Sequence, residues 1–222
     1  MSFQIVKPDI ADDLKPGDLN SVSLLALAEG DEICGASFCE GRLSDMAGER
    51  LEFSGCRFSR CEFSDFEITW ISFVDCLFEM CDFSNARLAG STFSKCAFKG
   101  CRGTGVNFDG ASIRQAAFDD CALPYANFSQ AKLQRVVWRD CDLNQSSFVN
   151  AKPKSIAFQN CDLSRAEIMG FPLAGTDLST CQIDGIRLAA YISASELRGA
   201  EVSAGQACDL ARLLGVIIKA AE

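Results

Sequence analysis

Large apolar residues recur at every fifth position through most of the chain. Stepping by five from Ile33 to Leu188 gives 32 positions, of which 29 hold Phe, Leu, Ile or Trp; the exceptions are Gly48, Gly103 and Pro153. Between residues 33 and 188 there are 19 acidic and 16 basic side chains, and none lies at this position or two residues before it. Burying an unpaired charge costs several kcal/mol. Both positions are therefore predicted to face an interior.

A period of five matches neither an α-helix, with a period of 3.6, nor a strand, with a period of 2. It fits a coil of short faces that turns a corner after every five residues. Four faces would repeat every 20 residues, and two sets of like residues do recur at that spacing: Phe38, Phe58, Phe78, Phe98, Phe118, Trp138, Phe158, and Cys61, Cys81, Cys101, Cys121, Cys141, Cys161, Cys181. At a strand spacing of about 4.8 Å, about eight coils would make an all-β rod roughly 40 Å long.

The repeating unit is a small residue, a polar one, then Leu or Phe, and two more polar ones. Ala126-Asn-Phe-Ser-Gln, Ala166-Glu-Ile-Met-Gly and Cys161-Asp-Leu-Ser-Arg follow it. This pattern resembles the pentapeptide-repeat family and covers residues 33 to 188, more than two thirds of the chain. The resemblance implies a right-handed quadrilateral β-helix.

Residues 191 to 218 are similar to the ending of the group that contains Qnr, MfpA, McbG and AlbG. That resemblance implies a last partial coil at 200–202, a short C-terminal helix and a final apolar strand at 216–218 that pair two subunits. Ser203 and Gln206 form a capping-box pattern, and Gly215 is placed to end the helix. The residues predicted to form the dimer contact are Ala207, Leu210, Leu213, Leu214, Val216, Ile217 and Ile218.

The chain is thus divided into a cap segment at 1–30, the β-helix at 31–188, and a loop, last coil and dimerisation segment at 189–222. Within the cap segment, Asn20 to Gly30 reads as a short helix with Asn20 as N-cap and Gly30 as stop. A solenoid needs its open ends covered, which gives this helix its expected role. The irregular positions Gly48, Gly103 and Pro153 predict a cavity or a displaced backbone.

The chain has no His, which removes histidine bases, histidine nucleophile pairs and imidazole metal ligands. Ten of the 13 Cys lie in the small-residue position, where a buried thiol behaves as a small apolar side chain. Pairs five residues apart, such as Cys56 and Cys61, do not have the usual zinc spacing. Cys34, Cys39 and Cys208 lie outside this position and are candidate reactive thiols. We expect no cofactor, no metal site and no enzymatic activity.

Net charge is -9, and the acid is concentrated near the N-terminus: residues 1–82 hold 17 acidic and 6 basic side chains, whereas residues 83–222 hold 13 and 15. An acidic protein is a poor ligand for bare nucleic acid and a better one for a basic protein surface. The repeat frame directs nine N-terminal carboxylates, called the acidic arm, toward solvent: Asp45, Glu49, Glu52, Glu62, Asp65, Glu67, Asp75, Glu79 and Asp82.

The family resemblance implies that such an arm binds DNA gyrase or topoisomerase IV and protects it from poisons such as fluoroquinolones or albicidin, by DNA mimicry in some members. The alternative is an interaction scaffold for an unrelated partner, because every repeat feature is shared by both. We further expect a homodimer with no direct nucleic-acid or membrane contact and no small-molecule substrate. The N-terminus lacks a signal-peptide pattern and no apolar run reaches transmembrane length, so a cytoplasmic location is expected.

Overall fold

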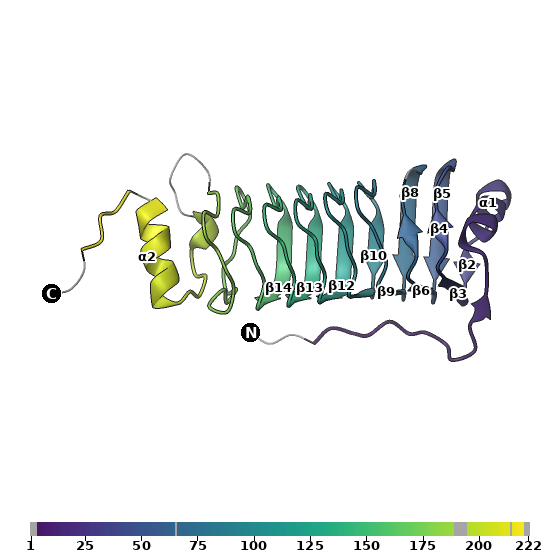
Figure 1. Cartoon of the computed structure of the whole chain (residues 1–222), viewed down its shortest axis with the longest axis horizontal. Helices are drawn as coiled ribbons and strands as arrows, with labels where there is room; N and C mark the ends of the chain where they lie inside the picture. The colour runs from purple at the N-terminus through teal and green to yellow at the C-terminus, as the bar shows by residue number, and fades with distance from the viewer. Residues whose placement is uncertain (1–3, 65, 189–194, 214, 220–222) are drawn as a thin grey trace.

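A computed structural model shows a right-handed quadrilateral β-helix with a short C-terminal helix (Figure 1). The structure describes residues 4–64, 66–188, 195–213 and 215–219. Consecutive coils lie in parallel register, and each residue pairs with the residues 20 positions before and after it. Phe118, for example, pairs with Phe98 on one side and Trp138 on the other. The solenoid has about seven turns rather than eight, because the periodic segment stops at Leu188 before an eighth turn is complete.

Every strand pair is parallel, and twelve strands form one sheet while β4 and β7 form a second. The helices are α1 (Leu19–Glu29), the 3-10 turn η1 (Ser195–Leu197) and α2 (Ala204–Leu213). The strands are β1 (Lys15–Pro16), β2 (Ile33–Cys34), β3 (Ala36–Cys39), β4 (Arg42–Leu43), β5 (Ala47–Ser54), β6 (Arg57–Ser59), β7 (Glu62–Phe63), β8 (Glu67–Val74), β9 (Leu77–Glu79), β10 (Thr92–Ser94), β11 (Ala97–Lys99), β12 (Ser112–Asp119), β13 (Lys132–Arg139) and β14 (Lys152–Gln159).

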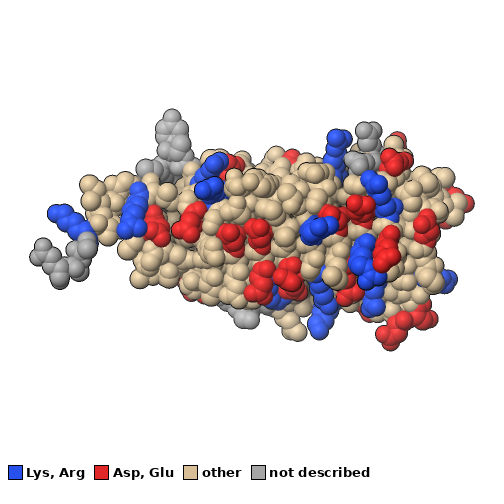
Figure 2. All heavy atoms as spheres, in the orientation of Figure 1, with Lys and Arg blue, Asp and Glu red and all other residues tan. Residues whose placement is uncertain are grey.

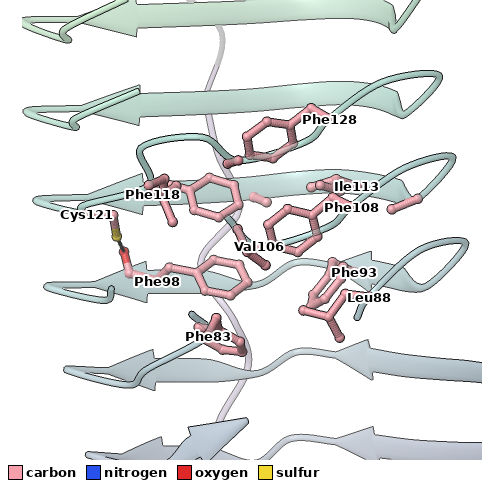
Figure 3. Close-up of a cluster of buried hydrophobic side chains, with 14 of the residues drawn as sticks. Phe83, Leu88, Phe93, Phe98, Val106, Phe108, Ile113, Phe118, Cys121 and Phe128 are labelled. Atoms are coloured by element: carbon pink, nitrogen blue, oxygen red, sulfur yellow. Dashed lines mark hydrogen bonds between the residues drawn. The ribbon is translucent and has the colours of Figure 1, made fainter. Parts of the chain in front are cut away.

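The interior is a set of stacked aromatic columns, as the long repeat period predicts. The column that runs from Phe38 to Phe158 has ring centroids 4.4 to 5.7 Å apart, each nearly parallel to the next. Rings of neighbouring columns meet edge to face, as Phe73 does with Phe78. Figure 3 shows this packing around Phe98, Phe108 and Phe118. Offset stacking and edge-to-face contact are the two favourable aromatic geometries, so the columns add to the burial energy.

The corners of the coil lie two residues after each large apolar position. Most corner residues between Glu40 and Gly185 adopt positive φ angles, for example 58° at Asn85 and 61° at Gly55. Gly has no Cβ penalty in this region, and Asn and Asp tolerate it better than other residues. The corner requirement therefore explains why this position carries Gly, Asn and Asp so often and large apolar residues so rarely.

Helix α1 covers the N-terminal end of the solenoid, and its stop at Gly30 is confirmed. Gly30 has φ 76° and its N–H donates to Ala26 O. The N-cap prediction is wrong by two residues: Asp18, not Asn20, accepts a hydrogen bond from Ser21 N at 2.8 Å. Asn20 instead lies in the first turn, where its Oδ1 accepts from Ser44 N.

Candidate partner-binding surfaces

The described members of the acidic arm lie on the outside of the N-terminal coils. Asp45, Glu49 and Glu62 are exposed. Glu52, Asp75, Glu79 and Asp82 are half-buried. Asp65 and the side chain of Glu67 lie outside the described residues.

Ion pairs neutralise much of this arm. Glu62 lies 3.6 Å from Arg42 Nε, Asp82 lies 2.7 Å from Arg102 Nη2, and Asp75 lies 3.5 Å from Lys95 Nζ. Glu52 pairs with Arg50. Most of these partners are 20 residues apart in the sequence, since residues at that spacing are neighbours on adjacent coils.

The arm is also spread around the solenoid rather than gathered on one face. Glu49, Glu62 and Glu79 occupy three different faces, because their positions in the repeat period differ. Figure 2 shows basic side chains interspersed among the acidic ones over the N-terminal coils. Glu49 and Glu79 have no ion pair or side-chain hydrogen bond within the described ranges and are its uncompensated members.

At the other end, α2 begins and ends as the sequence predicts. Ser203 N donates to Gln206 Oε1 at 2.7 Å and Gln206 N donates to Ser203 Oγ at 3.3 Å, which is the expected capping box. Gly215 has φ 80°, and its N–H donates to Arg212 O while Val216 N donates to Ala211 O. These two bonds form a Schellman ending.

Gln206 also attaches α2 to the solenoid, a role that the sequence did not reveal. Its Nε2 donates to Leu178 O at 2.8 Å and to Cys181 O at 2.7 Å. Leu210 is buried beside it. The last partial coil is confirmed as well. Glu201 pairs with Asp177, which is 24 residues earlier, whereas the bridged residues of the other coils are 20 apart, so this coil is out of phase with the rest.

The remaining residues predicted to form the dimer contact are largely exposed. Leu213, Val216 and Ile217 expose 49%, 52% and 88% of their surface, and Ile218 exposes 37%. Ala207 is exposed too, and Leu214 lies outside the described residues. The predicted strand at 216–218 is not formed by the single chain, because a strand needs a hydrogen-bonding neighbour and none of the described residues pairs with it.

Of the two alternatives expected at the irregular positions, a cavity is not found at Gly48 or Gly103. A Cβ at Gly48 would lie 2.6 Å from Leu27 Cδ2 of α1, and a Cβ at Gly103 would lie 2.7 Å from Leu123 Cδ2. Neighbouring side chains fill both places. Gly48 is therefore the position at which the cap helix inserts a side chain over the coil.

At Pro153 the backbone hydrogen bonds to the following coil are interrupted, whereas β14 stays paired with β13 on its other side. In most coils the N–H of the large apolar position donates to a carbonyl of the next coil, as from Phe128 to Ser147 and from Leu163 to Gln182. Pro153 has no N–H, and Asn160 N donates to Thr180 Oγ1 instead of a backbone carbonyl. The following coil, unlike β14, has a turn bond from Thr176 N to Leu173 O.

The backbone thus changes from the extended strand β14 to a turn in the next coil. A cleft of about 460 Å³ lies between β14 and residues 175–180. Its lining includes Ile156, Phe158, Asp177 and Glu201. Phe171 distinguishes this coil from the preceding ones. It is fully buried and stacks on Phe148, and it occupies the inward position at which the preceding coils carry Ala111, Ala131 and Ala151.

The ten periodic Cys are buried thiols, and nine of them, from Cys56 to Cys161, donate from Sγ to backbone carbonyls. Cys121 Sγ lies 3.6 Å from Phe98 O and Cys141 Sγ lies 3.3 Å from Phe118 O (Figure 3 shows the first). Burial raises the pKa of Cys96 to about 12, because the interior disfavours the thiolate. Cys34 and Cys39 are exposed, and Cys208 is half-buried.

These environments predict two classes of thiol reactivity. Ellman's reagent should modify Cys34, Cys39 and Cys208 in the native protein, whereas the ten periodic thiols should react only after denaturation, because the reagent cannot reach their buried Sγ atoms. Mass spectrometry of quenched samples would assign the sites. Rapid labelling of Cys96 or Cys141 in the native state would show that the columns open readily.

Two properties bear on chemistry and location. Among the described residues, no group of three or more Cys, Asp or Glu is arranged to hold a metal ion. Neither α1 nor α2 has the length and apolar character required to cross a bilayer, and the same holds for η1.

The sequence matches the pentapeptide repeat region over residues 71–145 and 121–188, more than half of the chain. Together with the solenoid geometry, this match shows that the chain belongs to the pentapeptide repeat family. No curated protein sequence matches it at a significant level.

Three solved structures illustrate the similarities found. Full-length QnrB1, a plasmid-mediated fluoroquinolone resistance protein, is 24% identical, with 91% of this chain and 95% of QnrB1 covered and a TM-score of 0.30. HetL from Nostoc sp. strain PCC 7120, involved in heterocyst differentiation regulation, is 16% identical over 83% and 94% of the two chains, with a TM-score of 0.25. Rfr23 from the cyanobacterium Cyanothece 51142 is 14% identical with a TM-score of 0.33, and the match covers 48% of this chain and 64% of Rfr23, just under two thirds. At these scores the similarities do not distinguish between functions.

Proposed function

We propose that this protein is a non-enzymatic, cytoplasmic homodimer that binds DNA gyrase or topoisomerase IV and protects it from poisons. Its ends have different tasks in this proposal. The C-terminal segment joins two copies, and the N-terminal coils form two distal arms that contact the enzyme. The division into a cap at 1–30, a β-helix at 31–188 and a dimerisation segment at 189–222 belongs to the same proposal.

The observation that carries the partner assignment is the excess of acid in residues 1–82, which hold 17 acidic against 6 basic side chains. A DNA-binding enzyme presents a basic surface, and complementary charge speeds encounter by about 10- to 1,000-fold. The uncompensated carboxylates Glu49 and Glu79, with the weakly paired Glu62, are the side chains best placed to supply this field.

A second candidate function is a scaffold for an unrelated partner, and one observation favours it. A DNA mimic needs regularly spaced negative charge, yet the Arg42–Glu62 and Asp82–Arg102 pairs neutralise the N-terminal part of one column of outward side chains. Under this alternative the acidic residues maintain solubility, and a different surface makes the contact.

Reversing Glu49, Glu62 and Glu79 to Lys should distinguish the two. The exposed changes should leave unfolding within about 0.5 kcal/mol of the parent, whereas association with gyrase should slow by about tenfold or more at low salt. The control reverses three carboxylates outside the acid-rich residues 1–82, Asp109, Asp184 and Glu201, to Lys. Surface plasmon resonance and a supercoiling assay with ciprofloxacin would measure both.

Equal loss in the two triple variants would mean that net charge alone matters. Unchanged binding by the N-terminal variant would refute the acidic contact. A parent protein that neither binds nor protects gyrase or topoisomerase IV would favour the scaffold function.

A further inference from the structure

The N-terminal segment does not end at the cap but runs back along the outside of the solenoid. Figure 1 shows it beneath the coils, extending from α1 toward the middle of the rod. Strand β1 holds one end by pairing with β3. Further along, Asp9 N donates to Asp75 Oδ1 at 3.0 Å. The sequence pattern carries no sign of this course, because residues 4–14 have no repeat.

Beneath this segment the outward surface is apolar. Leu77, Ala97 and Ala117 lie side by side on adjacent strands, at the residue before the large apolar position, which is outward-facing and polar in most five-residue units of the chain. All three expose less than a tenth of their surface. Ile5, Pro8 and Ile10 of the segment are half-buried against the same region. An apolar column at an outward position is the sequence signal that a covered face exists.

The segment does not fill the space above this column. A cavity of about 350 Å³ remains between Ile5, Pro8 and Ile10 on one side and Leu77 with Ala97 on the other. Small-molecule sites usually measure about 300–1,000 Å³ and combine an apolar lining with a few polar groups. The cavity lies at the lower end of this range.

Four cations and one carboxylate complete the lining. Arg139 is engaged with Asp119, at 2.7 Å. Lys7, Arg57 and Lys99 have no ion pair or side-chain hydrogen bond among the residues that the structure describes. The lining therefore carries a net charge of +3 in a protein whose net charge is -9.

We propose that this cavity binds a small amphipathic anion, one acidic headgroup on a short apolar body. The headgroup, a carboxylate or a phosphate, contacts Arg57, Lys99 and Lys7, and the apolar body lies on Leu77 and Ala97. Each part of the ligand then meets the lining that favours it, because cations strengthen a hydrogen bond to an anion and apolar burial is favourable without direction. A bound ligand would also link the N-terminal segment to the solenoid.

The first test uses 1-anilinonaphthalene-8-sulfonate, an anionic amphiphile that fluoresces in apolar sites, with the full-length protein. One saturable site per chain is expected, with affinity that falls as salt rises. Octanoate and octyl phosphate should displace the dye, and octanol should not. The better competitor of the two anions identifies the preferred headgroup. Equal displacement by octanol would refute the need for an anion.

Two variants locate the site independently. Arg57→Gln/Lys99→Gln should weaken dye binding about tenfold or more, because both uncompensated cations of the solenoid wall are removed. Ala97→Phe should block binding without changing the charge, since it places a ring in the cavity. The matched control, Lys132→Gln/Lys154→Gln, removes two exposed cations from β13 and β14 outside the cavity and should bind as the parent does.

The exposed C-terminal segment is the competing site for the dye, and Ile217→Asp tests it. Binding that is lost in Ile217→Asp and retained in Arg57→Gln/Lys99→Gln would overturn the proposal. Circular dichroism should confirm that each variant is folded. If Ala97→Phe prevents folding, the double cation variant still decides, because both of its side chains are exposed.

Discussion

The double variant Val216→Asp/Ile217→Asp is expected to be a monomer of 24.0 kDa, whereas the parent should be a dimer of twice that mass. Val216 and Ile217 expose 52% and 88% of their surface next to the half-exposed Leu213. An exposed apolar segment of this kind marks an interaction site, and a two-fold dimer lets one segment cover its copy. An unpaired carboxylate in that contact costs several kcal/mol, which is enough to raise Kd by at least tenfold.

Light scattering coupled to size exclusion would measure both masses over a range of concentrations. Substitution is preferable to truncation, because α2 covers the end of the solenoid through Gln206 and Leu210. Leu25→Asp is the control: Leu25 is 58% exposed on α1, at the opposite end, and this variant should stay dimeric. A parent mass of 24.0 kDa at all concentrations would remove the dimer from the proposal.

The solenoid was predictable because a single rule is repeated many times. Each five-residue unit must present two uncharged positions inward, so the periodicity alone located the columns that include Phe98 and Cys121. The capping box at Ser203 was predictable for a different reason, since it depends on two residues three positions apart. Both signals are local or strictly periodic.

The features that the sequence did not reveal depend on contacts without such a rule. Leu27 fills the space above Gly48 from a helix outside the repeat, and residues 4–14 cross several coils. The ion pairs of the acidic arm could have been predicted in part. Arg42 and Glu62 are 20 residues apart, and that spacing indicates that they are neighbours on adjacent coils. Opposite charges at outward positions 20 residues apart therefore predict an ion pair rather than an uncompensated acidic surface.

Phe98→Ala is expected to destabilise the solenoid by about 3–5 kcal/mol, the usual cost of removing a buried ring. Phe98 lies between Phe78 and Phe118, with ring centroids 4.7 and 4.4 Å away, and is 2% exposed. The backbone ladder holds β9, β11 and β12 in register, so the neighbouring coils cannot close the gap. Domains of ordinary stability have about 5–15 kcal/mol in total, so this single change removes a large fraction.

Urea unfolding followed by the fluorescence of Trp138 would measure the loss, because Trp138 is fully buried in the same column, two coils further along. Met80→Ala is the matched control: Met80 is 68% exposed two residues after Phe78, and its truncation should change the free energy of unfolding by about 0.5 kcal/mol or less. Each repeat is stabilised mainly by its neighbours. If Phe98→Ala unfolds at the same urea concentration as Met80→Ala, the aromatic columns do not act as one continuous core.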